Sequence, residues 1–427
     1  MEDTYIIAGA AVPGLSAPQD LKISGGFIED FGPSLPREDG IRIIDASGLV
    51  LSYGFADLHV HFREPGNPEK ESIRSGSLAA ARGGYTTVCA MPNIDPVPDS
   101  PGTLQAELDI IRRDAAIEVL PYCSITMGRK GLEVVDMGAL KGSCAAFSDD
   151  GSGVQDGAVM LKAMRTAARE DCIIAAHCED ESLLGGGYIH DGRWCAAHGH
   201  RGICPESEWK QIERDISLCE ESGCRYHVCH ISTAKSVELI REAKARGLRI
   251  SCETAPHYLL LCEDDMQEDG RFKMNPPLRT AQDRDALVEG LRDGTIDAVA
   301  TDHAPHTAQQ KSLGLKGSAM GVTGLETAFP VLYTGLVLTG LISLQRLLQA
   351  LSEGPRRIFN LAGGLRAGER ADLCLIDTGA RHVIDSRDFM SKGHSTPFDG
   401  MQVQGKIRMT IFNGKTVYDS TKEKTGA

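Results

Sequence analysis

Residues 57–66 read DLHVHFREPG, a short apolar run that ends in two histidines separated by one residue. Successive side chains of a β-strand point to opposite faces, so residues i and i+2 share a face. His59 and His61 would therefore point the same way at the end of a strand. Two imidazoles on one face can bind a metal ion, but two ligands do not make a site. The alternative is one structural histidine beside an incidental neighbour.

The same kind of run recurs between residues 50 and 310. Eight short runs, rich in β-branched or small apolar residues, end in polar side chains: FADLHVHF, YTTVCAMPN, IEVLPYCSI, CAAFSDD, CIIAAHCED, RYHVCHIS, RISCETAPHY and IDAVATDHAPH. Segments with helical spacing, such as SVELIREAKARG and DRDALVEGLRDG, separate them. Eight alternating strand and helix units predict an α/β fold of the (β/α)8 TIM-barrel type, whose active sites lie at the C-terminal ends of the strands.

The two ends of the chain have a different pattern. Residues 1–52 contain TYIIAGAAV, LKISGGFIED and IRIIDASG, and residues 365–427 contain ADLCLID and KIRMTIFNGKTVYD. These are typical of short strands joined by Gly and Asn turns. We predict that both ends pair into one small β-domain, which leaves residues 53–364 for the barrel.

The composition limits the class of protein. A chain of 427 residues with 41% hydrophobic residues suffices for one large barrel with an appendage. A formal net charge of -14 without a basic block argues against a nucleic-acid partner. The start MEDTYIIAGA is unlike a signal peptide and no run of about 18 apolar residues occurs, so we expect no membrane association and a cytoplasmic location. The 13 cysteines are scattered through apolar runs, which fits a reducing compartment.

Further side chains that can bind metals end the other runs. They are Asp149 and Asp150 in FSDDG, His177 in AAHCED, His230 in HVCHIS and Asp302 in ATDHAPH. Either of these histidines alone could be a hydrogen-bonded residue at a strand end. Together with the first pair, they match the donors that two Zn²⁺ ions prefer, namely imidazoles, a bridging carboxylate and open positions for water. The sequence therefore predicts a metal site at the barrel mouth.

The segments DLHVHFREPG, ARGGYTTVCAMPN, FSDDG, AHCED, HVCHIS, KMNPPLR, ATDHAPH and GLETAFP resemble, in this order, those of the amidohydrolase superfamily and its bacterial class I dihydroorotases. HFREPG combined with MNPPLR is specific, whereas H-x-H is shared by the whole superfamily. The resemblance covers nearly the entire chain. It implies two Zn²⁺ ions, with ligands distributed as follows: His59, His61 and Asp302 for the first, His177 and His230 for the second, and Asp150 as the bridge.

The resemblance also implies the reaction, which is the reversible cyclisation of N-carbamoyl-L-aspartate to L-dihydroorotate in de novo pyrimidine (UMP) biosynthesis. The metals activate water, and Asp302 moves a proton to the leaving nitrogen. Arg63, two residues beyond His61 and on the same face if the strand continues, offers a planar fork for the substrate carboxylate. The family adds further substrate-binding positions, which are His61, Asn93, Asn275, His306, Met320 and Gly321.

Without the resemblance, these substrate-binding positions have other interpretations. Arg63 could be a surface ion-pair partner. Asn93 and Asn275 lie beside prolines and could be turn residues.

Two other functions compete with dihydroorotase. Allantoinase and dihydropyrimidinase also hydrolyse cyclic amides, but hydantoinases and their relatives bridge the metals with a carboxylated lysine, and no lysine ends the fourth run. A catalytically silent scaffold for aspartate transcarbamoylase would have lost metal ligands, and this chain keeps them all. A homodimer, common in the family, and an association with aspartate transcarbamoylase both fit the resemblance, and the sequence decides neither.

Two more segments stand out. TAQQKSLGLKGSAM, residues 307–320, is a polar stretch that could close over the substrate or be a mobile loop, and Met320 stands where relatives often have an aromatic residue. CAAHGHRGIC has a spacing that a structural zinc site could use, at Cys195, His198, His200 and Cys204. The family has unrelated residues there, so we do not expect a third metal.

Overall fold

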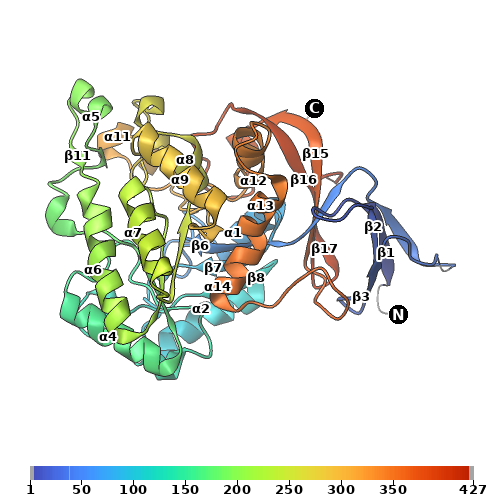
Figure 1. Cartoon of the computed structure of the whole chain (residues 1–427), viewed down its shortest axis with the longest axis horizontal. Coiled ribbons are helices and arrows are strands. Elements are labelled where there is room, and N and C mark those ends of the chain that lie inside the picture. The colour runs from blue at the N-terminus through green and yellow to red at the C-terminus, as the bar shows by residue number, and fades with distance from the viewer. Residues whose placement is uncertain (1–3, 38, 423–427) are drawn as a thin grey trace.

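The computed structural model describes residues 4–37 and 39–422 (Figure 1). Seven strands in two parallel sheets follow the predicted runs: β6 (Phe55–Val60), β7 (Tyr85–Ala90) and β8 (Glu118–Pro121) in one, and β9 (Ile173–Ala176), β12 (Arg225–Val228), β13 (Ile250–Thr254) and β14 (Ala298–Val299) in the other. Every residue of β6 and β7 is buried, as parallel strands covered on both faces require.

Single parallel bridges link these two sheets. Phe147 bridges to Cys123, just after β8, and to Ile174 in β9. Val60, the last residue of β6, bridges to His303, which lies in the eighth run, four residues after the end of β14. The fourth predicted run, CAAFSDD, therefore contributes one bridging residue instead of a strand. All eight runs take part in one continuous series of parallel pairings.

Helices cover the outside of the parallel strands (Figure 1). The longer ones are α1 (Ile73–Arg82), α2 (Pro101–Asp114), α4 (Gly157–Glu170), α6 (Glu206–Ser222), α7 (Ala234–Ala245) and α9 (Ala281–Asp293). The shorter ones are α3 (Met137–Leu140), α5 (Arg193–His198), α8 (Pro256–Leu260), α10 (Ala308–Lys311), α11 (Gly314–Gly317), α12 (Ala328–Leu332), α13 (Leu344–Leu348) and α14 (Gly354–Phe359).

Helix α4 illustrates why these segments are helical. The Asp156 carboxylate accepts hydrogen bonds from two backbone N–H groups of the first turn and so caps the helix. Met160, Ala163, Met164 and Ala167 are buried, and their spacing places them on one face of the helix. The sequence pattern therefore determines both where the helix begins and which face packs inward.

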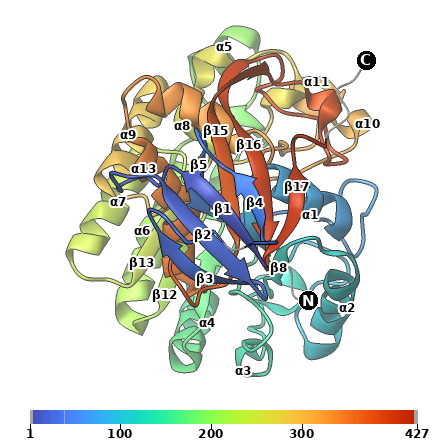
Figure 2. The ribbon, with the colours of Figure 1, turned by 90° about the vertical axis from the view of Figure 1, so that its right-hand side faces the viewer.

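The chain ends form two further sheets, which Figure 2 shows side by side. One has the order β3-β2-β1-β4, from β1 (Tyr5–Ala10), β2 (Gln19–Ser24), β3 (Phe27–Gly32) and β4 (Arg42–Asp45). The other has the order β17-β16-β15-β5, from β5 (Val50–Tyr53), β15 (Leu373–Val383), β16 (Gln402–Phe412) and β17 (Lys415–Asp419). A buried cluster of its own joins residues of both ends, among them Tyr5, Ile7, Leu21, Leu373 and Ile411.

Two further properties bear on the sequence predictions. All 13 cysteines are free thiols, and most of them are buried. Within residues 4–37 and 39–422, no helix has the length and apolar character needed to cross a bilayer.

Buried hydrogen bonds join the first run to the eighth. The Asp57 carboxylate accepts from the His59 N–H at 3.0 Å, and from the Thr301 N–H and hydroxyl at 3.1 and 2.6 Å. The His61 N–H donates to the His303 carbonyl at 2.8 Å. These contacts hold the two histidines of the first run beside Asp302.

Candidate metal centre and active site

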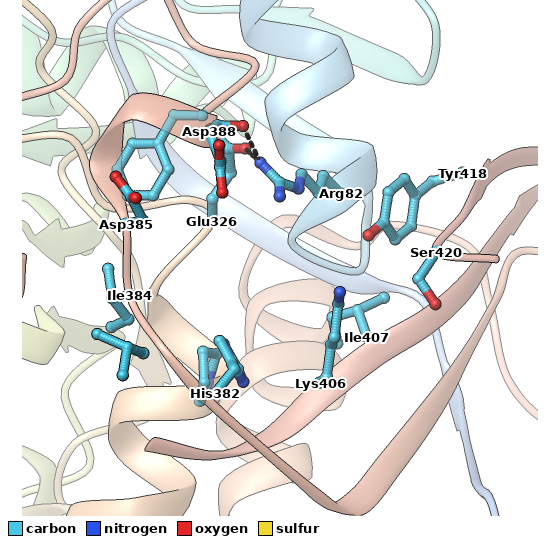
Figure 3. Close-up of a pocket in the computed structure, with 13 residues that line it drawn as sticks. Arg82, Glu326, His382, Ile384, Asp385, Asp388, Lys406, Ile407, Tyr418 and Ser420 are labelled. Atoms are coloured by element: carbon cyan, nitrogen blue, oxygen red, sulfur yellow. Dashed lines mark hydrogen bonds and ion pairs between the residues drawn. The ribbon is translucent and has the colours of Figure 1, made fainter. Parts of the chain in front are cut away.

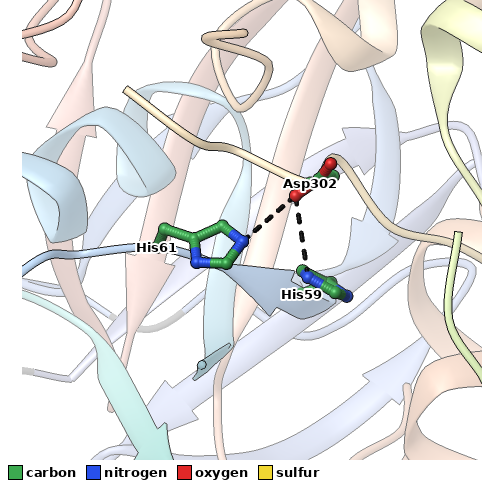
Figure 4. A group of neighbouring side chains, drawn as sticks. All are labelled: His59, His61 and Asp302. Atoms are coloured by element: carbon green, nitrogen blue, oxygen red, sulfur yellow. Dashed lines mark hydrogen bonds and ion pairs between the residues drawn. The ribbon is translucent and has the colours of Figure 1, made fainter. Parts of the chain in front are cut away.

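Three predicted ligands lie together at the carboxyl ends of the first and eighth runs (Figure 4). His61 Nε2 is 3.2 Å and His59 Nε2 is 3.6 Å from Asp302 Oδ1. All three side chains are buried and close enough to share one ion. This group contains the ligands that the family resemblance assigns to the first metal.

Asp150 lies between this group and the other two histidines. Its Oδ1 is 3.3 Å from His59 Nε2, 3.6 Å from His230 Nε2 and 3.7 Å from His177 Nδ1. Its Oδ2 is 3.6 Å from His61 Nε2. A carboxylate that faces four imidazoles has the position that a bridge between two cations needs.

The neighbouring Asp149 points elsewhere. Its carboxylate accepts hydrogen bonds from the Ile125 N–H at 2.8 Å, from the Thr126 N–H at 3.1 Å and from the Thr126 hydroxyl. These contacts hold the segment after β8. Of the two adjacent carboxylates, Asp150 alone faces the histidines.

The tautomers of the first two histidines follow from their outer partners. His59 Nδ1 lies 3.2 Å from Glu253 Oε1, and His61 Nδ1 lies 2.8 Å from Asn93 Oδ1. Because both partners are acceptors, each Nδ1 carries the hydrogen and each Nε2 presents its lone pair toward the carboxylates. His59 Nε2 and Asp150 Oδ1 have no hydrogen-bond partner in the described part of the chain, although both are buried. Such atoms fit a divalent cation.

Glu253 is a functional candidate to which the sequence analysis assigned no role. It is fully buried in β13, with Oε1 against His59 and Oε2 3.2 Å from His227 Nε2. Burial alone would raise its pKa, but the adjacent imidazoles of His227 and His59 lower the pKa to about 2. The sequence does contain a clue to this role, because Glu253 lies inside the apolar run RISCETAPHY, and a buried carboxylate needs a partner.

The two inner carboxyl groups are ionised at neutral pH. Burial alone would raise the pKa of Asp150, but His59 and His230 hold that pKa well below its ordinary value. The pKa of Asp302 is also lowered, because the nearby imidazoles of His61, His59 and His230 outweigh burial. Both groups are therefore available as anionic ligands.

A pocket of about 220 Å³ opens beside these ligands. All seven predicted substrate-binding residues line it, which are His61, Arg63, Asn93, Asn275, His306, Met320 and Gly321. The structure thus brings the predicted residues together in one place. A separate pocket of about 320 Å³ beside α1, β15 and β16 contains the 3.0 Å ion pair of Arg82 and Glu326 (Figure 3). None of the predicted site residues lines that second pocket.

Arg63 does not lie on the strand, contrary to the expectation from spacing. Strand β6 ends at Val60, and Arg63 has a left-handed backbone with φ 57°. The His61 N–H still donates to the His303 carbonyl, but residues 61–63 belong to no strand and residues 64–66 form a turn. The guanidinium nevertheless reaches the pocket from this turn.

Arg63 is the cation of the pocket. Burial lowers its pKa only to about 10, so the side chain stays charged at neutral pH. Burial and the charge of Arg63 lower the pKa of His306 to about 3, so that ring is neutral. His306 Nε2 lies 2.8 Å from the Met320 carbonyl and must donate to it, which makes its 3.5 Å approach to Arg63 a contact without a hydrogen bond.

Asn93 is more than a turn residue. Besides accepting from His61, it donates through Nδ2 to Asp150 Oδ2 at 3.4 Å. It therefore connects two candidate metal ligands while lining the pocket.

The residues of CAAHGHRGIC have other contacts. His200 Nδ1 lies 2.8 Å from the Tyr188 hydroxyl and its Nε2 contacts the Glu268 carboxylate, while His198 stacks on Trp194 with ring centroids 4.0 Å apart. Within residues 4–37 and 39–422, neither Cys195 nor Cys204 belongs to a group of three or more side chains that could bind one metal ion together.

Comparisons with known proteins agree with the geometry. Residues 48–236 match the family model described as dihydro-orotase-like, and residues 219–418 match the amidohydrolase family model. A dihydroorotase of Geobacillus sp. (strain WCH70) is 48% identical over 407 residues, which is 95% of each chain. One from Shouchella clausii (strain KSM-K16) is 49% identical over 417 residues, 93% of this chain and 98% of the relative.

Solved structures show the same fold. The L-hydantoinase (dihydropyrimidinase) from Arthrobacter aurescens has a TM-score of 0.88 at 25% identity, over 98% of this chain and 96% of the other. The dihydropyrimidinase from Brevibacillus agri NCHU1002 has a TM-score of 0.85 at 22% identity, over 97% and 95%. The sequence identity to the two dihydroorotases is about twice the identity to these two solved structures, and it extends over nearly the full length of the chain. It confirms the resemblance seen in the motifs. The chain belongs to the dihydroorotase family of the amidohydrolase superfamily.

Proposed function

We propose that this protein is a dihydroorotase, which interconverts N-carbamoyl-L-aspartate and L-dihydroorotate in pyrimidine biosynthesis. The observation that carries the proposal is the half-buried cation Arg63 in the same pocket as the metal-ligand cluster. Dihydroorotate is a cyclic amide that also bears a carboxylate, whereas hydantoin, dihydrouracil and allantoin have none. A guanidinium that is partly withdrawn from water favours a substrate that can neutralise it.

We also propose that residues 53–364 form a closed (β/α)8 barrel, with residues 1–52 and 365–427 in one small β-domain. The continuous parallel pairings, which return from His303 to Val60, support the barrel. The antiparallel pairing of β5 with β15 and the separate buried cluster support the β-domain.

For the metals, we propose two Zn²⁺ ions per chain. His59, His61 and Asp302 would hold one, His177 and His230 the other, and Asp150 both. Imidazole and carboxylate donors with short separations suit zinc. When bound, such a pair polarises a carbonyl group and makes water nucleophilic near neutral pH.

The side chains of the pocket perform the remaining steps. Arg63, with Asn275 and the backbone near Gly321, orients the ring through its carboxylate. In the hydrolytic direction Asp302 accepts a proton from the attacking water and delivers it to the ring nitrogen as the C–N bond breaks. In the cyclising direction the carbamoyl nitrogen attacks the carbon of the protonated side-chain carboxyl group and forms the C–N bond. Asp302 takes the proton of that nitrogen and delivers it to the hydroxyl, which leaves as water when the C–O bond breaks.

Substrate preference tests this proposal. Purified protein loaded with Zn²⁺ is expected to hydrolyse dihydroorotate and to leave hydantoin, dihydrouracil and allantoin intact. Turnover of any of the last three without turnover of dihydroorotate would assign the protein to another cyclic-amide hydrolase activity.

Arg63→Lys is expected to weaken dihydroorotate binding although the charge is kept, because an ammonium cannot reproduce a bidentate fork. The expected loss is about 1.5 to 3 kcal/mol, or roughly ten- to a hundredfold in kcat/KM. Steady-state kinetics measure it. Arg74→Lys, at an exposed position of α1, is the matched control and should behave as wild type. An unchanged kcat/KM for Arg63→Lys would place the carboxylate pocket elsewhere.

Asp150→Ala is expected to reduce the bound metal below two ions per chain, because it removes the only carboxylate that faces all four imidazoles among the residues described. Asp149→Ala is the control. It should keep the metal but unfold more easily, by about 1 to 3 kcal/mol for each buried donor left without an acceptor. Elemental analysis and thermal denaturation measure the two effects. If Asp149→Ala lost metal and Asp150→Ala kept two ions per chain, Asp149 would be the bridging ligand.

A further inference from the structure

Lys311 ends α10 and is nearly completely buried, with 7% of its surface exposed. Its Nζ donates to the carbonyl oxygens of Gly321 at 2.7 Å, Ala319 at 2.9 Å and Lys273 at 3.1 Å. Burial lowers the pKa of Lys311 to about 7, but three carbonyl acceptors at Nζ require the ammonium form, in which each of the three N–H donors has its own acceptor. Burying a charge is unfavourable unless hydrogen bonds compensate for it. The three carbonyls therefore stabilise Lys311, and Lys311 in turn determines where they lie.

Two of these carbonyls lie on either side of Met320. The Met320 carbonyl accepts the hydrogen bond from His306 Nε2, and both residues line the pocket. Gly321 has φ 132°, and a Cβ at this position would come within 2.5 Å of the Ala304 carbonyl. The backbone of this wall thus packs directly against the segment that follows Asp302, which leaves little room for displacement.

The third carbonyl belongs to a different segment of the same wall. Lys273 lies two residues before Asn275, another pocket residue. The Gly321 N–H also donates to the Lys273 carbonyl, at 3.0 Å. One ammonium therefore joins the segment around Asn275 to the segment around Met320.

We propose that Lys311 is a positioning residue for substrate binding, which holds Asn275, Met320 and Gly321 at the distance that dihydroorotate requires. This inference rests on the proposed function. Lys311 itself does not line the pocket, and its ammonium donates to backbone carbonyls instead of contacting metal ligands. It acts on the wall that binds the substrate, so its loss should affect substrate affinity more than metal binding or the chemical step.

Lys311→Met keeps the length of the side chain and removes all three donors. We expect KM for dihydroorotate to rise roughly ten- to a hundredfold, the scale of a lost charged hydrogen bond, with kcat within about threefold of wild type. Metal content should be unchanged. Lys311→Arg, which keeps a charged donor, should recover part of the affinity. Lys316→Met is the matched control, because Lys316 is exposed in the same segment, and its KM should equal that of wild type.

Hydrogen exchange gives a readout that does not depend on turnover. The Gly321 amide, bonded to the Lys273 carbonyl, should exchange faster in Lys311→Met than in wild type or in Lys316→Met. If Lys311→Met does not fold, Lys311→Gln, which keeps an amide donor, takes its place in both measurements. Its KM for dihydroorotate should rise and its Gly321 amide should exchange faster than in wild type, each by less than is expected for Lys311→Met.

The outcomes separate the inference from the proposed function. If wild type fails to turn over dihydroorotate, the proposed function is wrong, and the exchange measurement still tests whether Lys311 holds the wall. If wild type turns over dihydroorotate while Lys311→Met has an unchanged KM, the inference is wrong. A fall in kcat or in metal content at an unchanged KM would also overturn it.

Discussion

Removal of divalent metal by a chelator abolishes dihydroorotate turnover, and Zn²⁺ restores it, with recovery complete at two equivalents per chain. We expect this because the cluster around Asp150 contains four imidazoles and two carboxylates, which are donors for metal ions that make water nucleophilic near neutral pH. The measurement is a zinc titration of metal-free protein, followed by activity and elemental analysis.

Circular dichroism of the metal-free protein is the control for folding, because metal binding and folding are coupled. The lost activity must be recovered without a change in secondary structure. Asp150→Ala, treated in the same way, should not recover. Full turnover by protein verified to contain no metal would contradict the proposed mechanism.

Asp302→Asn should lose roughly 10² to 10⁴ in kcat, the usual scale for general acid and base catalysis, while it keeps much of its metal. Asp302 Oδ1 lies 3.2 Å from His61 Nε2, and the lowered pKa of this carboxyl keeps it ionised until it accepts a proton from water. Asparagine preserves the shape and one ligand oxygen but cannot carry that proton.

Kinetics and elemental analysis of the same sample measure this effect. Asp285→Asn, at an exposed position of α9, is the matched control and should retain wild-type kcat. If Asp302→Asn turned over within a few-fold of wild type with its metal bound, another group would have to move the proton. His306 would be the first to test, because its neutral ring lies in the same pocket.

Much of the candidate site could be predicted from local patterns. A period of two places His59 and His61 on one face, and the alternation of apolar runs with helical segments places the other ligands at strand ends. These patterns indicate which face of a single strand or helix is buried, because the order of apolar and polar residues within that element determines it. The relatives confirm the family that the motifs indicate.

Contacts between distant segments could not be predicted in this way. His59 meets Glu253 across 194 residues, and this contact determines which imidazole nitrogen faces the carboxylates. Asp149, and not Asp150, turns away from the histidines because the Ile125 and Thr126 N–H groups donate to its carboxylate. The spacing of apolar residues along the chain does not predict such contacts.

The sequence by itself determined which residue types end each run, and hence the chemistry of the site and the family. Only the tertiary structure decided that Arg63 enters the pocket from a turn, that a single residue of the fourth run bridges both sheets, and that Lys311 joins two segments of the pocket wall. The physical reason is that burial follows a local period, whereas hydrogen-bond direction depends on groups that folding brings together from far apart in the chain.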